Sequence, residues 1–375
     1  MQDWETLLAA PSARVRRRGR FVVVDLQGPH LAASTSSRNG GQADRLRHLV
    51  NHQSCEGSGH DTRFHEIIAR GPEGYHDAVC GEIALPPETT AVMGTAANMS
   101  SAAVAVERDG ELEVGAIVTA GVQTNATCAG DPASWREASN GMEKVAGTIN
   151  ILLLVSRPLT PPALAGVVVT MTEAKSSALQ RLAVPSRYSQ DLATGTGTDQ
   201  YAIAAPSEGG RPLTSASPHI KLGEMIGLAV RRATMESLRW QNGLEPSYTR
   251  SVCHALGRYG LDEATFADDM AAHLPAADLQ LLRRNTKAVL YDPGAGAAAH
   301  ALAAVLDRVR HGTLPAAMAA DAAVQQAALL AANVAAQPER WAEMRARLHA
   351  SQALEPKTLV LAALALGWQE KWRSA

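Results

Sequence analysis

A change of character near Gly243 is the feature that most constrains how this chain of 375 residues can fold. Before it, short runs rich in Val and Ile alternate with stretches of helical spacing and Gly-rich turns. Residues 261–375 are instead dominated by Ala and Leu and are interrupted by prolines about every twenty residues. The two parts predict an α/β domain over residues 1–245, a sheet of mixed or undecided strand direction flanked by helices, and then a helical domain over 246–375.

The elements of the first part follow from composition and spacing. Four apolar runs rich in Val or Ile and bounded by Gly, Pro or Asp predict buried strands over residues 20–26, 112–119, 148–155 and 201–204. Helical spacing predicts helices over residues 41–51, 161–182 and 219–242, the last of which ends at Gly243. The second part reads as four or five helices, whose apolar faces make a homo-oligomer one alternative.

Charge and cysteine usage narrow the classes of function. Thirty-five basic and thirty-seven acidic residues leave a net charge of −2, which gives no global reason to expect binding to nucleic acid or to an anionic membrane. Four widely separated cysteines match neither a disulfide framework nor a zinc site. Without a secretory signal or an apolar run of about 20 residues, the sequence predicts a soluble cytoplasmic protein.

Polar residues gather in the turns of the first part. Asn125 lies in a turn of small residues, and Thr148 and Asn150 open an apolar strand. Residues 193–199 alternate Thr with Gly and end in Asp199, so their backbone N–H groups could cradle an anion or an oxyanion. The structural alternatives are a capped turn, a buried hydrogen-bonded Asn and a tight loop.

Titratable residues mark two helices. Glu173 and Lys175 interrupt an apolar helix, and we expect Glu173 near a buried face, where burial would raise its pKa and suit it to general base work. The alternative is a helix end that emerges into solvent. His219 and Lys221 stand at a helix start, where the dipole disfavours cations, although Lys221 could simply pair with Glu224.

Histidines offer a metal alternative. His48 and His52 are four residues apart on the helix expected there, and His60 and His65 follow in a polar loop. Because no compact third ligand is evident, no metal site is assigned, and a divalent metal stays open as an alternative.

The order of the polar segments resembles that of the adenosylcobinamide amidohydrolase family from about residue 20 to residue 242. The blocks that carry the resemblance are NGG (39–41), NHQ (51–53), MGTAANM (93–99), TAGVQTNATCAGDPA (119–133), GTINILLLV (147–155), TEAKSSAL (172–179), SRYSQDLATGTGTDQ (186–200) and HIKLGEMIG (219–227).

The resemblance implies hydrolysis of the amide that joins a corrin propionate to aminopropanol, giving adenosylcobyric acid, in corrinoid salvage and remodelling. Some members are thought to act on complete cobamides. The corrinoid is then the substrate, and no cofactor is expected. Cys128 stands where family members typically have Arg, and residues 54–60 look like an insertion. A related amidohydrolase with a different amide substrate, or a non-catalytic corrinoid-binding protein, are therefore the alternatives.

Amide hydrolysis needs a nucleophile, stabilisation of an oxyanion and a proton for the leaving amine. Because no Ser or Cys triad is evident, water activated by a carboxylate is expected, with Glu173 preferred as the base over Asp199. His219 or Lys221 would protonate the amine. The expected catalytic residues are Glu173, Lys175, Asp199 and His219, and the expected substrate-binding residues are Asn51, His52, Asn125, Thr148, Asn150, Thr196, Thr198, Lys221 and Glu224.

Overall fold

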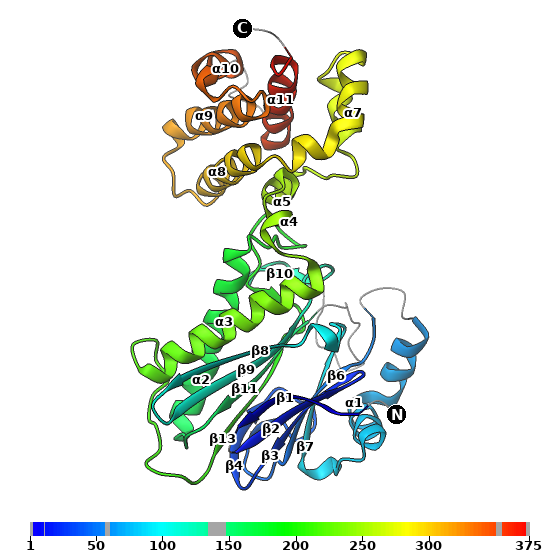
Figure 1. Ribbon diagram of the computed structural model, residues 1–375, viewed down its shortest axis with the longest axis vertical. Coiled ribbons are helices and arrows are strands. Elements are labelled where there is room, and N and C mark those ends of the chain that lie inside the picture. The colour runs from blue at the N-terminus through cyan, green and yellow to red at the C-terminus, as the bar shows by residue number, and fades with distance from the viewer. Residues whose placement is uncertain (1–2, 11, 57–60, 134–147, 350–354, 373–375) are drawn as a thin grey trace. The chain divides into compact units, whose positions relative to one another are not determined.

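The chain forms two compact units, Met1–Leu244 and Glu245–Ala375. The structure is a computed structural model and describes residues 3–10, 12–56, 61–133, 148–349 and 355–372. The first unit combines mixed sheets with helices, and the second is helical, which confirms the expected fold class (Figure 1).

In its described residues, the first unit is built from strands and three long helices. Its strands are β1 (Glu5–Ala10), β2 (Ala13–Arg18), β3 (Phe21–Leu26), β4 (His30–Ser34), β5 (Gly41–Ala43), β6 (His48–Gln53), β7 (Thr90–Thr95), β8 (Ala103–Asp109), β9 (Leu112–Ala120), β10 (Ala126–Thr127), β11 (Ile149–Val155), β12 (Gly195–Thr196) and β13 (Gln200–Pro206). Its helices are α1 (Asp61–Ile83), α2 (Pro161–Arg181) and α3 (Lys221–Asn242).

The large strands form two mixed sheets rather than the single sheet expected. One has the order β1-β2-β3-β6-β7 and the other the order β5-β4-β13-β11-β9-β8. The pairs β6–β7 and β11–β13 are parallel, and the other pairs within these two sheets are antiparallel. The two sheets pack face to face, with α1 on the outer face of the first and α2 and α3 on the outer face of the second (Figure 1).

This layering explains why the predicted strands are apolar throughout. In β3, Val22 and Val24 join the core between the sheets, whereas Phe21 and Val23 pack against α1. Successive side chains of a strand point to opposite faces, so a strand that is buried on both faces loses the polar alternation of a half-buried one.

The same effect accounts for a wrong prediction, the helix over residues 41–51. That segment instead contributes β5 and the greater part of β6. Leu49 faces the core between the sheets and Val50 packs against α1, so both faces of β6 are buried. Apolar residues on both faces produced the spacing that resembles a helix.

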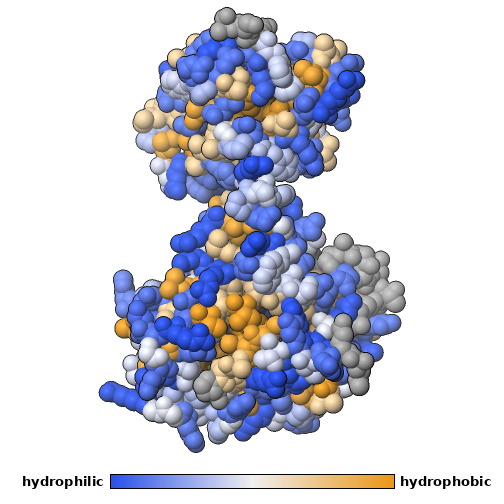
Figure 2. All heavy atoms as spheres, in the orientation of Figure 1, coloured by the Kyte–Doolittle hydropathy of each residue, from blue (hydrophilic) through white to orange (hydrophobic). Residues whose placement is uncertain are grey.

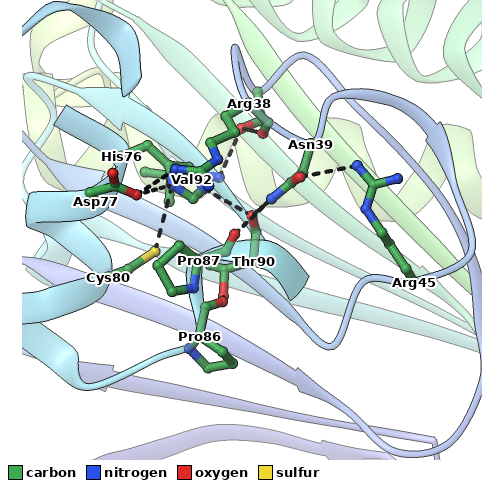
Figure 3. Close-up of polar contacts among 11 residues, drawn as sticks. Arg38, Asn39, Arg45, His76, Asp77, Cys80, Pro86, Pro87, Thr90 and Val92 are labelled. Carbon is green, nitrogen blue, oxygen red and sulfur yellow. Dashed lines mark hydrogen bonds and ion pairs between the residues drawn. The ribbon is translucent and has the colours of Figure 1, made fainter. Parts of the chain in front are cut away.

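The NGG segment fixes the edge of the second sheet to the first. Asn39 has a left-handed backbone, with φ of 60°. Its Nδ2 donates hydrogen bonds to the carbonyls of Pro87 (2.7 Å) and Thr90 (2.8 Å), and Arg45 donates to its Oδ1 (Figure 3). The segment therefore holds the β4–β5 connection against the start of β7, which is an architectural role.

The second unit is helical throughout its described part. Its longer helices are α7 (Ala276–Leu290), α8 (Pro293–Arg310), α9 (Ala316–Val334), α10 (Trp341–Leu348) and α11 (Pro356–Glu370). The carboxylate of Glu370 is buried and pairs with Arg340 at 2.9 Å and with Arg347 at 2.6 Å. Among the described helices, none alone is long and apolar enough to cross a membrane; α7 and α8, bent by 76°, pass that test only as a pair.

The surface is mostly hydrophilic, with local apolar areas (Figure 2). In the first unit, Leu7, Leu8 and Val104 are only partly buried where the edge strands β1 and β8 close the two sheets on one side. This edge does not contain any of the expected site residues.

Candidate functional site

Three polar side chains occupy one row of the second sheet, on the face that meets the first. Asn150 of β11 is the register partner of Thr119 on β9 and of Gln200 on β13. Side chains directly opposite each other on neighbouring strands lie on the same face. Leu152, two residues along β11, faces the core between the sheets, so this polar row faces inward as well.

The first sheet meets this row with Asn51 and Gly94. Asn150 Nδ2 donates to Asn51 Oδ1 at 2.8 Å and to the Gly94 carbonyl at 3.1 Å. Asn51 Nδ2 donates to Thr119 Oγ1 at 2.8 Å, and Gly94 N–H donates to Gln200 Oε1 at 3.0 Å. The network ties both sheets together, yet Asn150 Oδ1, which is fully buried, has no hydrogen-bond partner among the described residues.

A pair of hydroxyls stands one step further out. Thr148 and Thr198 each lie two residues before the polar row, Thr148 immediately before β11 and Thr198 two residues before β13. Their Oγ1 atoms are 2.5 Å apart and share a hydrogen bond. Because residues two apart on an extended chain share a face, Thr148 and Asn150 point to the same side.

An ion pair supports this end of the second sheet. Lys175 of α2 pairs with Asp199, and their side chains are 12% and 18% exposed. Asp199 also accepts hydrogen bonds from Ile149 N–H (3.0 Å) and from the N–H (3.1 Å) and hydroxyl of Thr196. Four donors therefore surround this carboxylate, and its oxygens hold the Thr196 backbone and the Lys175 ammonium in place.

The glycines of residues 193–199, the Thr-Gly loop, allow this close packing. A Cβ on Gly195 would overlap Asp199 Oδ2 and lie 2.7 Å from Lys175 Nζ. A Cβ on Gly197 would lie 3.0 Å from Asn125 Oδ1. The alternation of Thr and Gly thus serves the approach of Lys175 and Asn125 to the loop backbone.

Asn125 and Asp131 organise the turn beside the loop. Asn125 is buried, and its Oδ1 accepts a hydrogen bond from the Tyr188 hydroxyl at 2.8 Å. Asp131 Oδ2 accepts hydrogen bonds from Ser186 (2.5 Å) and Cys128 N–H (2.7 Å). Burial alone would raise the pKa of Asp131, but hydrogen bonds from Ser186 and its neighbours hold it below the ordinary value.

The polar row, the Thr148–Thr198 pair, the Lys175–Asp199 pair and Asn125 form one polar cluster. Glu173 lies outside this cluster. It is exposed on α2, which contradicts the expectation of a buried face. Glu173 and Lys175 are two residues apart, which places them about 200° apart around a helix, so only Lys175 turns toward Asp199. The neighbouring Ala174 supplies the buried contact that the apolar sequence indicates.

His219, Lys221 and Glu224 are far from the cluster as well. All three are exposed. Lys221 pairs with Glu224 at 2.6 Å, and this pairing, with a smaller contribution from the Asp109 carboxylate, raises the pKa of Lys221. The other end of α3 meets the cluster end of β9, where Ser237 accepts a hydrogen bond from Ala120 N–H. About 33 Å of helix separates the two ends of α3, at about 1.5 Å per residue over its 22 residues.

His52 faces the opposite side of β6 from Asn51. It stacks on Phe21 with ring centroids 4.7 Å apart, and its Nδ1 hydrogen-bonds with the Tyr75 hydroxyl at 2.9 Å. It lines a small hollow under α1 with a volume of about 50 Å³, together with Glu66, Arg70, Tyr75, Ala78, Val79 and Glu82. The structure thus places Asn51 and His52, which were expected to bind substrate together, on opposite faces of β6.

The expected His48–His52 arrangement on a helix is wrong because both residues lie on β6. Four residues of a strand span about 13 Å, too far for two ligands of one ion. His48 instead hydrogen-bonds Asp25 at 2.9 Å. His60 lies outside the described residues. In the part of the chain that the structure describes, no group of three or more His, Cys, Asp or Glu is placed to hold a metal.

Sequence reasoning missed four members of the site: Gly94, Thr119, Tyr188 and Gln200. Each lies inside or at the edge of a segment whose polar character was visible, and all four occur in blocks of the family resemblance. Their roles depend on strand register, which no local pattern reveals.

Comparison with known proteins gives a family match and a sequence relative. A family model described as adenosylcobinamide amidohydrolase matches residues 7–246, well over half of the chain. An uncharacterized protein of Methanocaldococcus jannaschii, MJ1613, is 36% identical over 183 residues, which are 46% of this chain and 71% of that protein.

Two solved structures share 14% sequence identity with the chain. The PH0078 protein from Pyrococcus horikoshii OT3 gives a TM-score of 0.32 and covers 63% of this chain and 82% of its own. A beta-aminopeptidase from a Burkholderia species gives a TM-score of 0.28 and covers 62% of this chain and 81% of its own. These TM-scores are too low to transfer a site from either structure.

Proposed function

The chain belongs to the adenosylcobinamide amidohydrolase family, whose members hydrolyse amide bonds, and we propose that its substrate is adenosylcobinamide. The bond cleaved is the amide between a corrin propionate and aminopropanol, and the products are adenosylcobyric acid and aminopropanol. This reaction would serve corrinoid salvage, and remodelling if complete cobamides are accepted.

The observation that carries the proposal is the convergence of the family blocks. Asn51, Gly94, Asn150, Lys175 and Gln200 come from five blocks spread over some 150 residues of sequence. The block that contains Thr119 and Asn125 joins them. Six blocks therefore contribute to one polar cluster between and beside the ends of the two sheets, as a substrate site would require.

The chemistry of the cluster suits an amide substrate. Asn and Gln side chains offer both donors and acceptors, and they match the peripheral amides of a corrinoid as well as the scissile one. The Lys175 ammonium supplies a positive charge that Asp199 holds in place. We assign the binding of the scissile amide to the surroundings of Thr148, Asn150 and Thr198.

The test is an end-point assay by mass spectrometry. The full chain is incubated with adenosylcobinamide, and adenosylcobyric acid and aminopropanol are expected in equal amounts. Equal yields are expected with and without a chelator, because the cluster offers hydroxyls, amides and one ion pair rather than a set of metal ligands. Binding of the corrinoid without release of aminopropanol would refute the proposal.

The Glu173→Gln variant tests whether Glu173 activates water, as the sequence led us to expect, or lies outside the active site, as the proposed site requires. Because Glu173 is exposed and turned away from Lys175, the variant should keep turnover within about twofold of the unchanged chain. Loss of turnover in a folded variant, with corrinoid binding kept, would return Glu173 to the role of base.

A different amide substrate is the second candidate, and Cys128 is the observation that favours it. Cys128 is partly exposed in the turn next to Asn125, where family members typically have Arg. Loss of a cation there changes which polar groups of a substrate are bound. Cys128→Arg should therefore lower KM for adenosylcobinamide if that is the substrate, and a panel that includes complete cobamides would reveal another preference.

A further inference from the structure

We propose that Gln200 is a catalytic residue of this amidohydrolase. Its side-chain amino group donates a hydrogen bond to the carbonyl oxygen of the scissile amide and stabilises the negative charge that develops on that oxygen. The inference rests on the proposed function and names the group that binds the reacting carbonyl.

The backbone N–H groups of the Thr-Gly loop, which the sequence offered for an oxyanion, are engaged within the protein. Thr196 N–H donates to Asp199 Oδ2 at 3.1 Å, and Gly197 N–H donates to the Asn125 carbonyl at 3.2 Å. A donor that already serves a protein acceptor must give up that bond to serve a ligand. The oxyanion therefore requires a different donor.

The buried amides of the polar row are closed to a substrate. Asn51 is 2% exposed, and Asn150 is fully buried. The Asn51 Nδ2 group donates to Thr119, and the Asn150 Nδ2 group donates to Asn51 and to Gly94. These amides join the two sheets to each other.

The side chain of Gln200 combines a fixed orientation with an accessible donor. Gly94 N–H donates to its Oε1 at 3.0 Å, and because a backbone N–H needs an acceptor, the amide cannot be turned over. Gln200 is partly exposed, and in the part of the chain that the structure describes its Nε2 is neither hydrogen-bonded nor one of the fully buried polar atoms. Both N–H bonds of this group are therefore open to a ligand.

The backbone on both sides of Gln200 is held in place. Asp199, the preceding residue, accepts hydrogen bonds from Ile149 N–H and from Thr196. Tyr201, the following residue, donates from its N–H to Thr35 Oγ1 at 3.0 Å and accepts at its carbonyl from Thr35 N–H at 3.0 Å. A donor on such a rigid strand needs little rearrangement at the moment of reaction, as stabilisation of an oxyanion requires.

An uncharged amide donor fits the electron flow of the reaction. When a nucleophile adds to the carbonyl carbon, an electron pair moves onto the carbonyl oxygen, and it returns when the carbon–nitrogen bond breaks. Gln200 keeps both of its protons throughout. Its hydrogen bond is stronger in the charged transition state than in the substrate, and loss of one such donor typically lowers kcat by about a hundredfold to a thousandfold.

The Gln200→Glu variant tests the donor. A carboxylate keeps the size of the side chain and still accepts from Gly94 N–H, but it cannot donate. Release of aminopropanol from adenosylcobinamide is measured by mass spectrometry over a range of substrate concentrations at pH 7. The value of kcat should fall by about a hundredfold to a thousandfold, while KM stays within about fivefold of that of the unchanged chain.

A pH profile distinguishes a donor from a structural role. A Glu side chain has an ordinary pKa of about 4.3, and its protonated form carries one O–H donor. The ratio of kcat for Gln200→Glu to kcat for the unchanged chain should therefore rise at least about fivefold from pH 7 to pH 5. Loss of packing alone would not be reversed by acid.

The Gln241→Glu variant is the matched control. Gln241, near the end of α3, is also partly exposed, and its Oε1 accepts a hydrogen bond from Asn98 N–H at 3.0 Å. The same exchange of an amide for a carboxylate should leave kcat within about twofold of that of the unchanged chain at both pH values.

A kcat for Gln200→Glu within about tenfold of that of the unchanged chain would overturn the assignment and leave the amidohydrolase function intact. An equal loss in Gln241→Glu, or a loss in Gln200→Glu that does not recover at pH 5, would also overturn it, in favour of a structural role. No release of aminopropanol by the unchanged chain would overturn the proposed function, and with it the role of Gln200 in this reaction.

Discussion

Replacing Asp199 by Asn tests whether the Lys175–Asp199 pair supports the site. The substitution keeps the size of the side chain but removes its charge and one of its two acceptor oxygens. Lys175 is then left 12% exposed without its counter-ion, and the new amide group meets donors where it needs acceptors. We expect both lower stability of the first unit and loss of turnover.

The magnitude follows from burial. Removing one partner of a buried pair costs about 3–5 kcal/mol, and the partial exposure of this pair places it near about 3 kcal/mol. At about 1.4 kcal/mol per tenfold change, this loss of stability corresponds to a roughly hundredfold rise in the equilibrium constant for opening of the first unit. Asp77→Asn is the matched control, because the Arg38–Asp77 pair is 33% and 55% exposed and should contribute at most about 1 kcal/mol.

Hydrogen exchange measured by mass spectrometry suits a chain of two units, because it reports each segment separately. Peptides from β11 and β13 should lose about a hundredfold in protection in Asp199→Asn, while peptides from α8 and α9 of the second unit keep theirs and serve as an internal reference. If Asp199→Asn and Asp77→Asn reduced protection equally, our account of the ion pair would be refuted.

Two further predictions use the packing and the titration of the first unit. Gly195→Ala should lower turnover at least about tenfold and lower the melting temperature, because its methyl group collides with the ion pair, whereas Gly227→Ala, in open space on α3, should leave both nearly unchanged. Burial alone would raise the pKa of Asp25, but hydrogen bonds from His48 and Arg16 lower it to about 2. The stabilising contribution of Asp25 is therefore complete above about pH 4 and is lost as the pH falls toward 2. Between pH 5 and pH 2, the melting temperature should fall more steeply for the unchanged chain than for Asp25→Asn. An equal fall of the melting temperature in the two proteins would contradict this.

Several elements were predictable because their patterns are local. Strands β3, β9, β11 and β13 lie within a few residues of the expected runs, and α2 begins at the expected residue. The prediction failed at β6, because burial on both faces of a strand removes the alternation that distinguishes it from a helix. Strands β1, β2 and β7 of the first sheet were not predicted either, so the division of the strands into two sheets was missed.

The sequence predicted which residues are polar and stand out, but not which of them come together in the candidate site. Thr148 and Asn150 stood out as polar groups at the start of an apolar strand, and Asn51 through the family resemblance. The structure brings the three to one end of the two sheets. Glu173 and His219 stood out equally, but helix orientation turns one into solvent and places the other at the far end of α3. Local sequence reveals that a side chain is polar, whereas its position depends on the packing of the whole element.

The sequence by itself determined the division into an α/β part and a helical part, the ordered blocks that place the chain in its family, and the amide chemistry that follows. Only the tertiary structure decided that Asn51 meets Asn150, that Thr148 meets Thr198, and that Lys175 rather than Glu173 faces Asp199. The physical reason is that hydrophobic periodicity and turn residues act over a few neighbours, whereas a site assembles through strand register and helix rotation between segments far apart in the chain.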